Sequence, residues 1–435
     1  MPDTGRGIEE VAEAARGRAA HARWLSRSRN EELTITAASD LSVTRRPPRE
    51  GTVVREMADG VQREWAVPGW HDDWITATTP TEEFRWTGEE PVAAVPLAAK
   101  IDRVREIQDA LRQSDPRVAQ VFAQVVERTE RRHITTDRFD RNAEITRVMV
   151  GAMVVVHDRG RTEQAFVVEG GAGGFELTRL SPERLKKLVE EAVRMLDAVP
   201  VDPGMYRVVA APEVSGVLAH EAFGHGVEMD LFLSGRTRAR EALGTEVGSR
   251  WATIIDDPTR RDGYGSYPID DDGSLAAPHV ILDQGRLVGG LADDEVARLL
   301  ASASPGNGRR QDYSRKVYPR MSNTLFAAGG DTLPDLLARV DSGIYLRRVE
   351  SGMEDPKNWG MQITVHAGEE IKNGRLTGKL YRTMAMTGFV PDVLKSIDGA
   401  TGEIEMSPGW CGKGWKEWTT NGTGGPHLSM TVRLG

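Results

Sequence analysis

The segment VSGVLAHEAFGHGVE, residues 214–228, carries the most informative chemistry of this 435-residue chain. Apolar residues dominate its first half and Pro212 stands just ahead of it, so we expect a helix that opens at Pro212. His220 and His225 flank Glu221 in this segment. In hydrolytic metal sites, histidines hold the ion and a glutamate takes a proton from its bound water. The segment therefore predicts two metal ligands and a general base; a core helix whose histidines bind backbone groups is the alternative.

The spacing of the two histidines constrains the shape of this helix. Residues i and i+4 of a regular α-helix lie roughly 40° apart around the axis, whereas i and i+5 lie about 140° apart. An undistorted helix would therefore separate His220 from His225. A π-bulge takes up one additional residue in a wider turn, and Gly224 makes such a distortion easier. We expect a π-bulge or a helix break between the two histidines.

Cys411 is the only cysteine, so it cannot form a disulfide within the chain. It lies in the glycine-rich stretch GWCGKG, residues 409–414, where its thiolate is a candidate third ligand for zinc. We expect Lys413 to help keep this thiol ionised, and Glu228, three residues after His225, to fix the tautomer of that imidazole. The alternatives are a buried cysteine without a role, an exposed Glu228, and a nucleophilic cysteine that uses one of the histidines.

Composition and charge exclude several classes of protein. Hydrophobic residues make up 39% and charged residues 28% of the chain, values typical of a soluble globular protein. With 56 Lys and Arg against 65 Asp and Glu, the net charge is -9, which disfavours nucleic acid as the main partner. No apolar run approaches the roughly 18 residues of a membrane span, and the N-terminus lacks the apolar core of a secretory signal. We therefore expect a cytoplasmic protein that binds neither nucleic acid nor membrane.

The residue pattern predicts three regions. These are an N-terminal α/β region over 1–98, a middle α/β region over 99–203, and a strand-rich domain over 204–435 that carries one prominent helix. Short strands bounded by turns, such as 280–282 and the strand before the turn at Asn373, typify the last region.

Within the first two regions, apolar periodicity predicts particular elements. We expect a helix over 6–26 that leads into strands, and a long surface loop over the tryptophan-rich stretch 65–86, whose rings pack on the surface or, alternatively, stack on a ligand. A helix is expected from Ala99 to Arg131. Another begins at Pro182, with Ser181 as its N-cap.

Three glycine-rich or charged loops resemble ligand sites only in part. Residues 170–174 are expected to form a flexible turn, because Glu176 stands where a dinucleotide loop needs glycine. Residues 270–273 lack the ligand pattern of a calcium loop and are expected to form a solvated turn. Residues 306–310 form either a plain loop or an anion site in which Arg309 takes a peptide carboxylate.

Six segments, ordered along the chain as in the family, resemble the TldD/PmbA family of metallopeptidases, specifically its metal-bearing TldD-type branch. They are VSGVLAHEAFGHGVE (214–228), DDPTRRDGYGSYPIDDDG (256–273), GNGRRQDYSRKVYPRMSN (306–323), residues 343–352, WCGKG (410–414) and GGPH (424–427). The first 98 residues match poorly, and residues 99–200 match only in pattern. After Cys411-Gly412-Lys413 the family usually continues with a Gly-Gln pair, whereas this chain has Gly414-Trp415-Lys416, so we expect substrate preference to differ and metal binding to be kept.

The resemblance implies an α+β zinc peptidase for small or unfolded peptides. Its N-terminal α/β regions would be followed by a C-terminal domain whose antiparallel sheet carries the metal-site helix. It assigns zinc to His220, His225 and Cys411, and the role of general base to Glu221. It also implies a dimer, either a homodimer or a heterodimer with a related subunit that lacks the metal ligands. A protease dedicated to one peptide natural-product precursor and a catalytically silent scaffold stabilised by metal are the alternatives.

The group that stabilises the oxyanion is not identified by the sequence. His427 and Tyr264 are candidates, and a structural role is the alternative for each.

Overall fold

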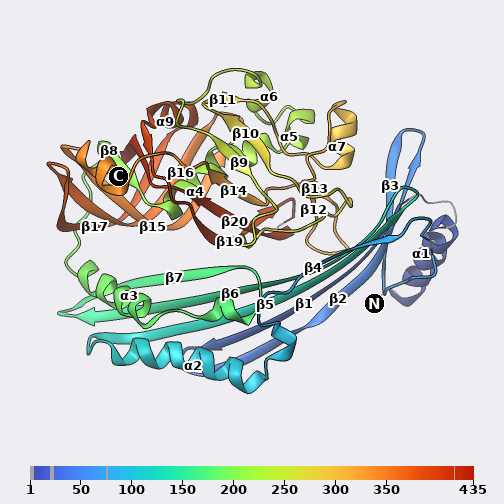
Figure 1. Ribbon diagram of the computed structural model, residues 1–435, viewed down its shortest axis with the longest axis horizontal. Helices are drawn as coiled ribbons and strands as arrows, with labels where there is room; N and C mark the ends of the chain where they lie inside the picture. The colour runs from blue at the N-terminus through green and yellow to red at the C-terminus, as the bar shows by residue number, and fades with distance from the viewer. Residues whose placement is uncertain (1–3, 20–23, 75–76, 416) are drawn as a thin grey trace.

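The computed structural model describes residues 4–19, 24–74, 77–415 and 417–435. Figure 1 shows two layers: a long curved sheet built from the first half of the chain, and a C-terminal body of further sheets and short helices that lies against one face of it. Helix α2 covers the opposite face of the curved sheet. The expected α+β class with a strand-rich C-terminal part is confirmed.

The curved sheet has the strand order β3-β2-β1-β5-β6-β4, and β7 pairs with the remaining length of β6. Its strands are β1 Trp24–Ala37, β2 Leu41–Ala58, β3 Val61–Pro68, β4 Thr81–Trp86, β5 Val118–Thr136, β6 Asp140–Asp158 and β7 Arg161–Ala172. Neighbours run antiparallel except β4 and β6, which are parallel. The long strands β5 and β6 therefore form the spine of the sheet.

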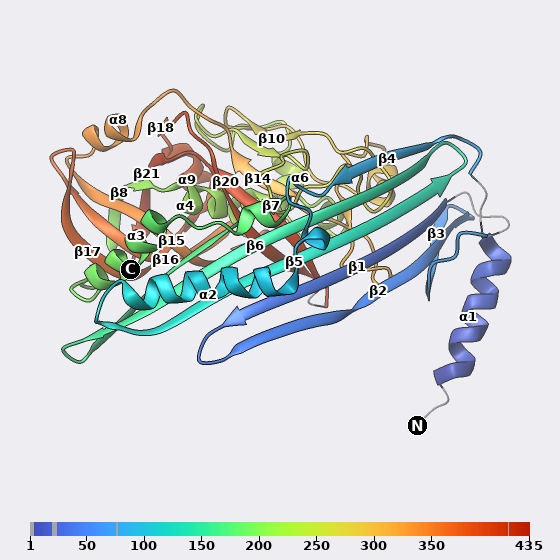
Figure 2. The same cartoon turned by 60° about the horizontal axis from the view of Figure 1, so that its bottom comes forward.

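Helices and short turns line this sheet. They are α1 Thr4–Ala19, α2 Leu97–Gln113, α3 Pro182–Met195, and the 3-10 turns Val92–Ala94 and Phe175–Thr178. Helices α2 and α3 share one apolar core with β1, β5, β6 and β7, and Figure 2 shows α2 lying along the sheet with α1 at its far end. The predicted start of α3 is confirmed, because Ser181 Oγ accepts the Arg184 N–H at 3.1 Å.

The helix expected from Ala99 to Arg131 is wrong in its second half. The helix ends at Gln113, and β5 begins at Val118. Beyond Pro116 the buried side chains alternate with a period of two, and β5 pairs with β1 and β6 along its length. Pairing in the sheet overrides the helical tendency of this charged stretch.

The long loop expected over residues 65–86 is also partly wrong. Trp65 lies in β3 opposite Val54, and Trp86 lies in β4 opposite Ile145. The turn signals of the Pro68-Gly69 pair end β3 and do not extend through the stretch, while residues 75–76 lie outside the described part of the chain.

The expected division at residue 98 falls between strands of one sheet. Strands β1–β4 belong to residues 1–98 and strands β5–β7 to residues 99–203, yet β1 pairs with β5 along its whole length. These two ranges therefore share a single hydrogen-bonded layer.

The C-terminal body contains two six-stranded sheets and the β12–β13 pair. One sheet has the order β11-β10-β9-β14-β20-β19 and the other β17-β16-β15-β8-β21-β18. Their strands are β8 Gly204–Ala210, β9 Ile254–Asp256, β10 His279–Asp283, β11 Arg286–Leu287, β12 Gly308–Arg309, β13 Tyr318–Pro319, β14 Asn323–Phe326, β15 Ser342–Asp355, β16 Gly360–Lys372, β17 Arg375–Phe389, β18 Gly399–Ala400, β19 Glu405–Lys413, β20 Glu417–Gly425 and β21 Leu428–Leu434. The strands predicted at 280–282 and before the turn at Asn373 are confirmed as parts of β10 and β16, each of which forms a hairpin with the next strand. Asn373 takes the left-handed φ of 51° that its tight turn requires.

Helix α4, Pro212–Ala219, lies between these two sheets. Val214 and Leu218 are fully buried in the largest apolar core of the described chain, against strands of both sheets. The remaining helices are short: α5 Asp230–Leu233, α6 Ala239–Ala242, α7 Asp294–Leu299, α8 Leu333–Ala338 and α9 Val390–Ser396. Across the described ranges, every helix is too short or too polar to cross a bilayer.

The solvated turn expected at residues 270–273 is wrong, because its three aspartates are buried. They join the body to the curved sheet: Asp271 lies 3.0 Å from Arg132 Nε, and Asp272 lies 2.6 Å from Arg55. Asp270 accepts the Gly308 N–H at 2.9 Å. The sequence near the turn could not reveal these partners, which lie on strands far away along the chain.

Candidate metal centre

The segment that carries the histidines departs from α-helical geometry where expected. After α4 the chain forms a π-turn, His220–Gly224, and then a 3-10 turn, His225–Val227, and the His225 N–H donates to the His220 carbonyl. The prediction of a π-bulge is thereby confirmed. A Cβ on Gly224 would lie 2.0 Å from Met321 Sδ, so close packing against Met321 requires glycine here.

The π-turn brings the two imidazoles to one side, where they meet Cys411 of β19. One donor atom each from His220, His225 and Cys411 lies within 4.8 Å of the others, and Cys411 Sγ lies 3.3 Å from His225 Nε2. The two rings meet edge to face, with centroids 5.0 Å apart. Among the described residues this is the one cluster of histidine, cysteine and acidic side chains with the spacing of a metal site.

The charges in this cluster favour a thiolate. Burial alone would raise the pKa of Cys411, but His225 and His220 hold it well below its usual range. Burial opposes the charged form of His225, yet the Cys411 and Glu228 charges raise the pKa of His225 well above its ordinary value. His220 Nδ1 is buried with no partner among the described atoms. Two imidazole nitrogens and a thiolate form a donor set that suits zinc, so the residues present fit this ion.

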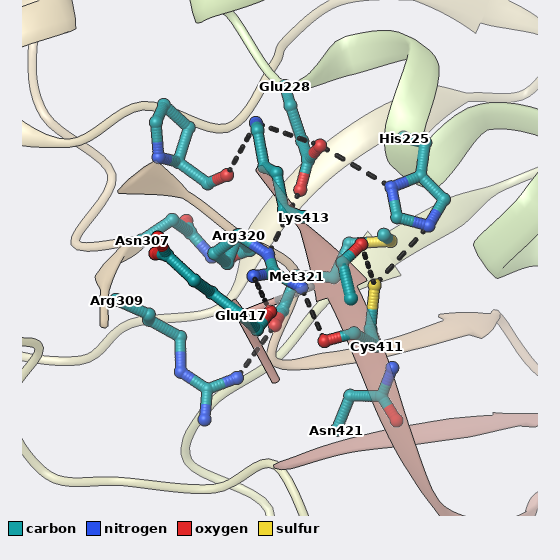
Figure 3. A network of polar contacts seen from close by, with 12 residues as sticks. His225, Glu228, Asn307, Arg309, Arg320, Met321, Cys411, Lys413, Glu417 and Asn421 are labelled. Carbon is teal, nitrogen blue, oxygen red and sulfur yellow. Dashed lines mark hydrogen bonds and ion pairs between the residues drawn. The ribbon is translucent and has the colours of Figure 1, made fainter. Parts of the chain in front are cut away.

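Glu228 lies behind His225, as expected (Figure 3). Its Oε2 is 3.4 Å from His225 Nδ1 and accepts from Lys413 Nζ at 3.0 Å. The Lys413 charge, opposing the effect of burial, lowers the pKa of Glu228 to about 2. Lys413 also donates to Asp230 at 2.8 Å, so its ammonium group is paired with the carboxylates of Glu228 and Asp230. The two imidazoles, and not Lys413, lower the pKa of the Cys411 thiol.

Glu221 lines two adjoining cavities, whose volumes are about 950 and 310 Å³. His220 and Trp410 also line both cavities. A Cβ on Gly352 would lie 2.5 Å from Glu221 Cγ, so the glycine makes room for this side chain. Within the described chain the Glu221 carboxylate has no hydrogen bond or ion pair. It is therefore free to act on a group that enters the cavity.

Three residues near the cluster were not predicted from the sequence as site residues. Arg320, almost fully buried, donates to the Cys411 carbonyl at 2.7 Å and lies 3.6 Å from Glu228. Asn421 Nδ2 lies 3.4 Å from His220 Nε2, and Glu354 of β15 lines the larger cavity. No local spacing signals these positions, although Arg320 lies within the segment 306–323 that carried the family resemblance and Asn421 lies three residues before the segment 424–427.

The other candidate residues lie apart from the cluster. Tyr264 packs edge to face on Trp410, and burial raises its pKa to about 12; its hydroxyl has no partner in the described structure. His427 Nε2 lies 3.0 Å from the Tyr345 hydroxyl. Arg309 is buried and donates to the Met321 and Thr420 carbonyls, so its guanidinium is already engaged within the protein.

Comparison with known proteins identifies the family. The PmbA/TldA metallopeptidase C-terminal domain matches residues 203–432, and the central domain of the same family matches residues 90–198. The chain belongs to the PmbA/TldD family of metallopeptidases. The resemblance to the TldD/PmbA family that the sequence motifs indicated is thereby confirmed.

Several relatives within the PmbA/TldD family carry protease names. A metalloprotease of Methanothermobacter thermautotrophicus is 34% identical over 66% of this chain and 62% of its own length. A metalloprotease TldD homolog of Haemophilus influenzae is 30% identical over 76% and 70%, and a zinc metalloprotease TldD homolog of Saccharolobus solfataricus is 28% identical over 57% and 55%. The chain thus spans about three fifths of the length of the first archaeal relative.

Two solved structures share the PmbA/TldD fold at low sequence identity. A Thermotoga maritima protein described as a candidate modulator of DNA gyrase has a TM-score of 0.80 at 17% identity, over 98% of this chain and 100% of that one. TldE from Thermococcus kodakarensis has a TM-score of 0.74 at 16% identity, over 98% and 100%. These likenesses support the fold.

Proposed function

We propose that this chain is a zinc-dependent peptidase that hydrolyses small or unfolded peptides. The observation that carries the proposal is the convergence of His220, His225 and Cys411 within 4.8 Å beside a cavity that Glu221 borders. The zinc and metalloprotease names of the relatives support it.

The three donors would hold zinc, which when bound supplies a Lewis acid that lowers the pKa of water and polarises a carbonyl. Glu221, unpartnered at the cavity wall, takes a proton from the attacking water and returns it to the leaving amine. Glu228 accepts from His225 Nδ1 and so orients the imidazole toward the cluster.

The proposed substrate is a short or unfolded peptide, because the cavity of about 950 Å³ has room for a few residues of extended chain and not for a folded domain. We also propose a cytoplasmic dimer, either of this chain alone or with a related subunit lacking the ligands; the shared fold with a protein named TldE supports the second form. A metal-stabilised scaffold is less well supported, because a structural site has no use for an unpaired carboxylate such as Glu221.

Replacement of Glu221 tests the proposal. Glu221→Gln keeps the size of the side chain and loses its basicity, so we expect unchanged zinc content and thermal stability while turnover of short unstructured peptides falls roughly 10²- to 10⁴-fold. Asp355→Asn removes an exposed carboxylate from β15 and is the control. Equal cleavage by wild type and Glu221→Gln would exclude Glu221 as the base. Absence of cleavage with every pairing of subunits would favour the scaffold.

A further inference from the structure

A second unpaired carboxylate, Glu354, faces the larger cavity from β15. Both of its oxygens are buried and have no hydrogen-bond partner among the residues described. The carboxylate packs against the turn that follows His225: a Cβ on Gly226 would lie 3.6 Å from its Oε2 and 3.7 Å from its Oε1. Glu354 is thus fixed close to the metal cluster without belonging to it, because the cluster contains only the two histidines and Cys411.

The other charged groups of this cavity wall do not neutralise Glu354. Lys413 is engaged by Glu228 and Asp230. Glu350 is paired with His366, whose Nδ1 lies 2.8 Å from it. Arg236 also lines the cavity, but neither Glu354 oxygen has a hydrogen bond to it among the described contacts. The wall therefore holds two carboxyl groups, those of Glu354 and Glu221, without a hydrogen-bond or ion-pair partner among the described residues.

An unpaired buried carboxylate lowers stability unless a partner arrives. Burial raises the pKa of Glu354 well above its usual range, and the charges of Glu221 and Glu228 raise it further, against the effect of His225. A compact cation that enters the cavity would restore the charged form and satisfy both oxygens. An ammonium group, with three donors on one nitrogen, fits such a pair of acceptors.

We propose that Glu354 binds an ammonium group of the peptide substrate, from either a free N-terminus or a lysine side chain, and so selects substrates that carry this charge next to the cleaved bond. This inference rests on the proposed peptidase function. It assigns Glu354 to substrate specificity and leaves proton transfer to Glu221.

Binding measured without cleavage tests this assignment. Glu221→Gln supplies an inactive background, and calorimetry on the zinc-loaded protein compares one peptide sequence in four forms: with a free N-terminus, N-acetylated, N-acetylated with one lysine, and N-acetylated with norleucine in place of that lysine. We expect one or both ammonium-bearing forms to bind roughly 10- to 100-fold more tightly than their neutral counterparts, as for a desolvated ion pair. The preference should vanish in Glu354→Gln and persist in Asp355→Asn, which removes the neighbouring exposed carboxylate.

The four peptides separate the sources of the charge. Preference for the free N-terminus alone, or for lysine alone, supports the assignment and names the source. A preference that survives Glu354→Gln, or no preference in the parent protein, overturns it. Glu354→Leu permits the same comparison if the amide variant fails to fold. Cleavage of these peptides by wild type is scored separately: a Glu354-dependent preference without cleavage contradicts the peptidase proposal and not the ammonium site.

Discussion

Two buried polar regions of this chain differ in how completely their groups are paired. At the joint between the curved sheet and the C-terminal body, the carboxylates of Asp271 and Asp272 meet arginines, and Asp270 accepts backbone N–H groups. In the metal cavity, the partly exposed carboxylate of Glu221 and the buried carboxylate of Glu354 have no hydrogen-bond or ion-pair partner in the described chain. Paired groups hold two layers together, whereas the unpaired groups are those to which we assign water activation and substrate binding. Whether a buried carboxylate has a partner therefore distinguishes structural from functional carboxylates better than the residue type, since both regions contain acidic residues.

Removing an arginine at the joint should produce the largest effect on stability. Arg55→Ala leaves the buried carboxylate of Asp272 without an ion pair and with only the Asp294 N–H as a donor among the described residues, so we expect a loss of about 3 to 5 kcal/mol in the free energy of unfolding. Chemical denaturation measures this loss. Arg16→Ala, which breaks the exposed pair with Asp73, is the control and should change stability by less than about 1 kcal/mol. Similar losses in both variants would remove the distinction between the joint and the surface.

Replacing the thiolate should chiefly affect metal binding. In Cys411→Ser we expect the zinc affinity to fall by at least about 100-fold, because a neutral hydroxyl replaces one of three donors. Competition with a chelator measures the affinity, and His427→Asn, a histidine outside the cluster, is the control. Zinc retained equally by wild type and Cys411→Ser would remove Cys411 from the site.

A smaller effect on stability is expected from the pH dependence of Asp293, which lies close enough to Asp272 of the joint to feel its charge. Burial and the Asp272 charge raise the pKa of Asp293 to about 7. Because the folded state then holds a proton that the unfolded state has lost, Asp293 makes stability fall as pH rises from about 4 to about 7. Relative to wild type, Asp293→Asn should therefore gain roughly 1 to 3 kcal/mol between pH 5 and pH 8.

Urea unfolding at the two pH values measures this change. Asp335→Asn, an exposed carboxylate in the first turn of α8, is the control and should show no such gain. A pH dependence that is the same in wild type and Asp293→Asn would show that Asp293 is ionised throughout this range.

The sequence predicted those features that local spacing determines. The five-residue interval between His220 and His225 predicted a π-bulge or a helix break, and a π-turn is present there; Ser181 before Pro182 marked the start of α3. Local spacing did not predict the role proposed for Glu354, because its carboxyl group packs against the turn at Gly226, more than a hundred residues away along the chain.

Residues of the joint and of β5 show the same limit. The aspartates at 270–272 were expected to be solvated because the arginine partners of Asp271 and Asp272 lie far away along the chain, on β5 and β2. The stretch after Pro116 looked helical because its charged residues conceal the period of two that pairing with β1 and β6 imposes. Long-range pairing therefore decides what the local pattern leaves ambiguous.

The separation of the metal donors along the chain has a consequence for biosynthesis. Cys411 follows His225 by 186 residues and lies in a strand whose partner, β20, comes later still. A nascent chain that has exposed the histidines and Glu221 thus has no thiolate to close the cluster, and β21 must still pair with β8 beside α4. The proposed hydrolysis would therefore begin only after the last strands have folded.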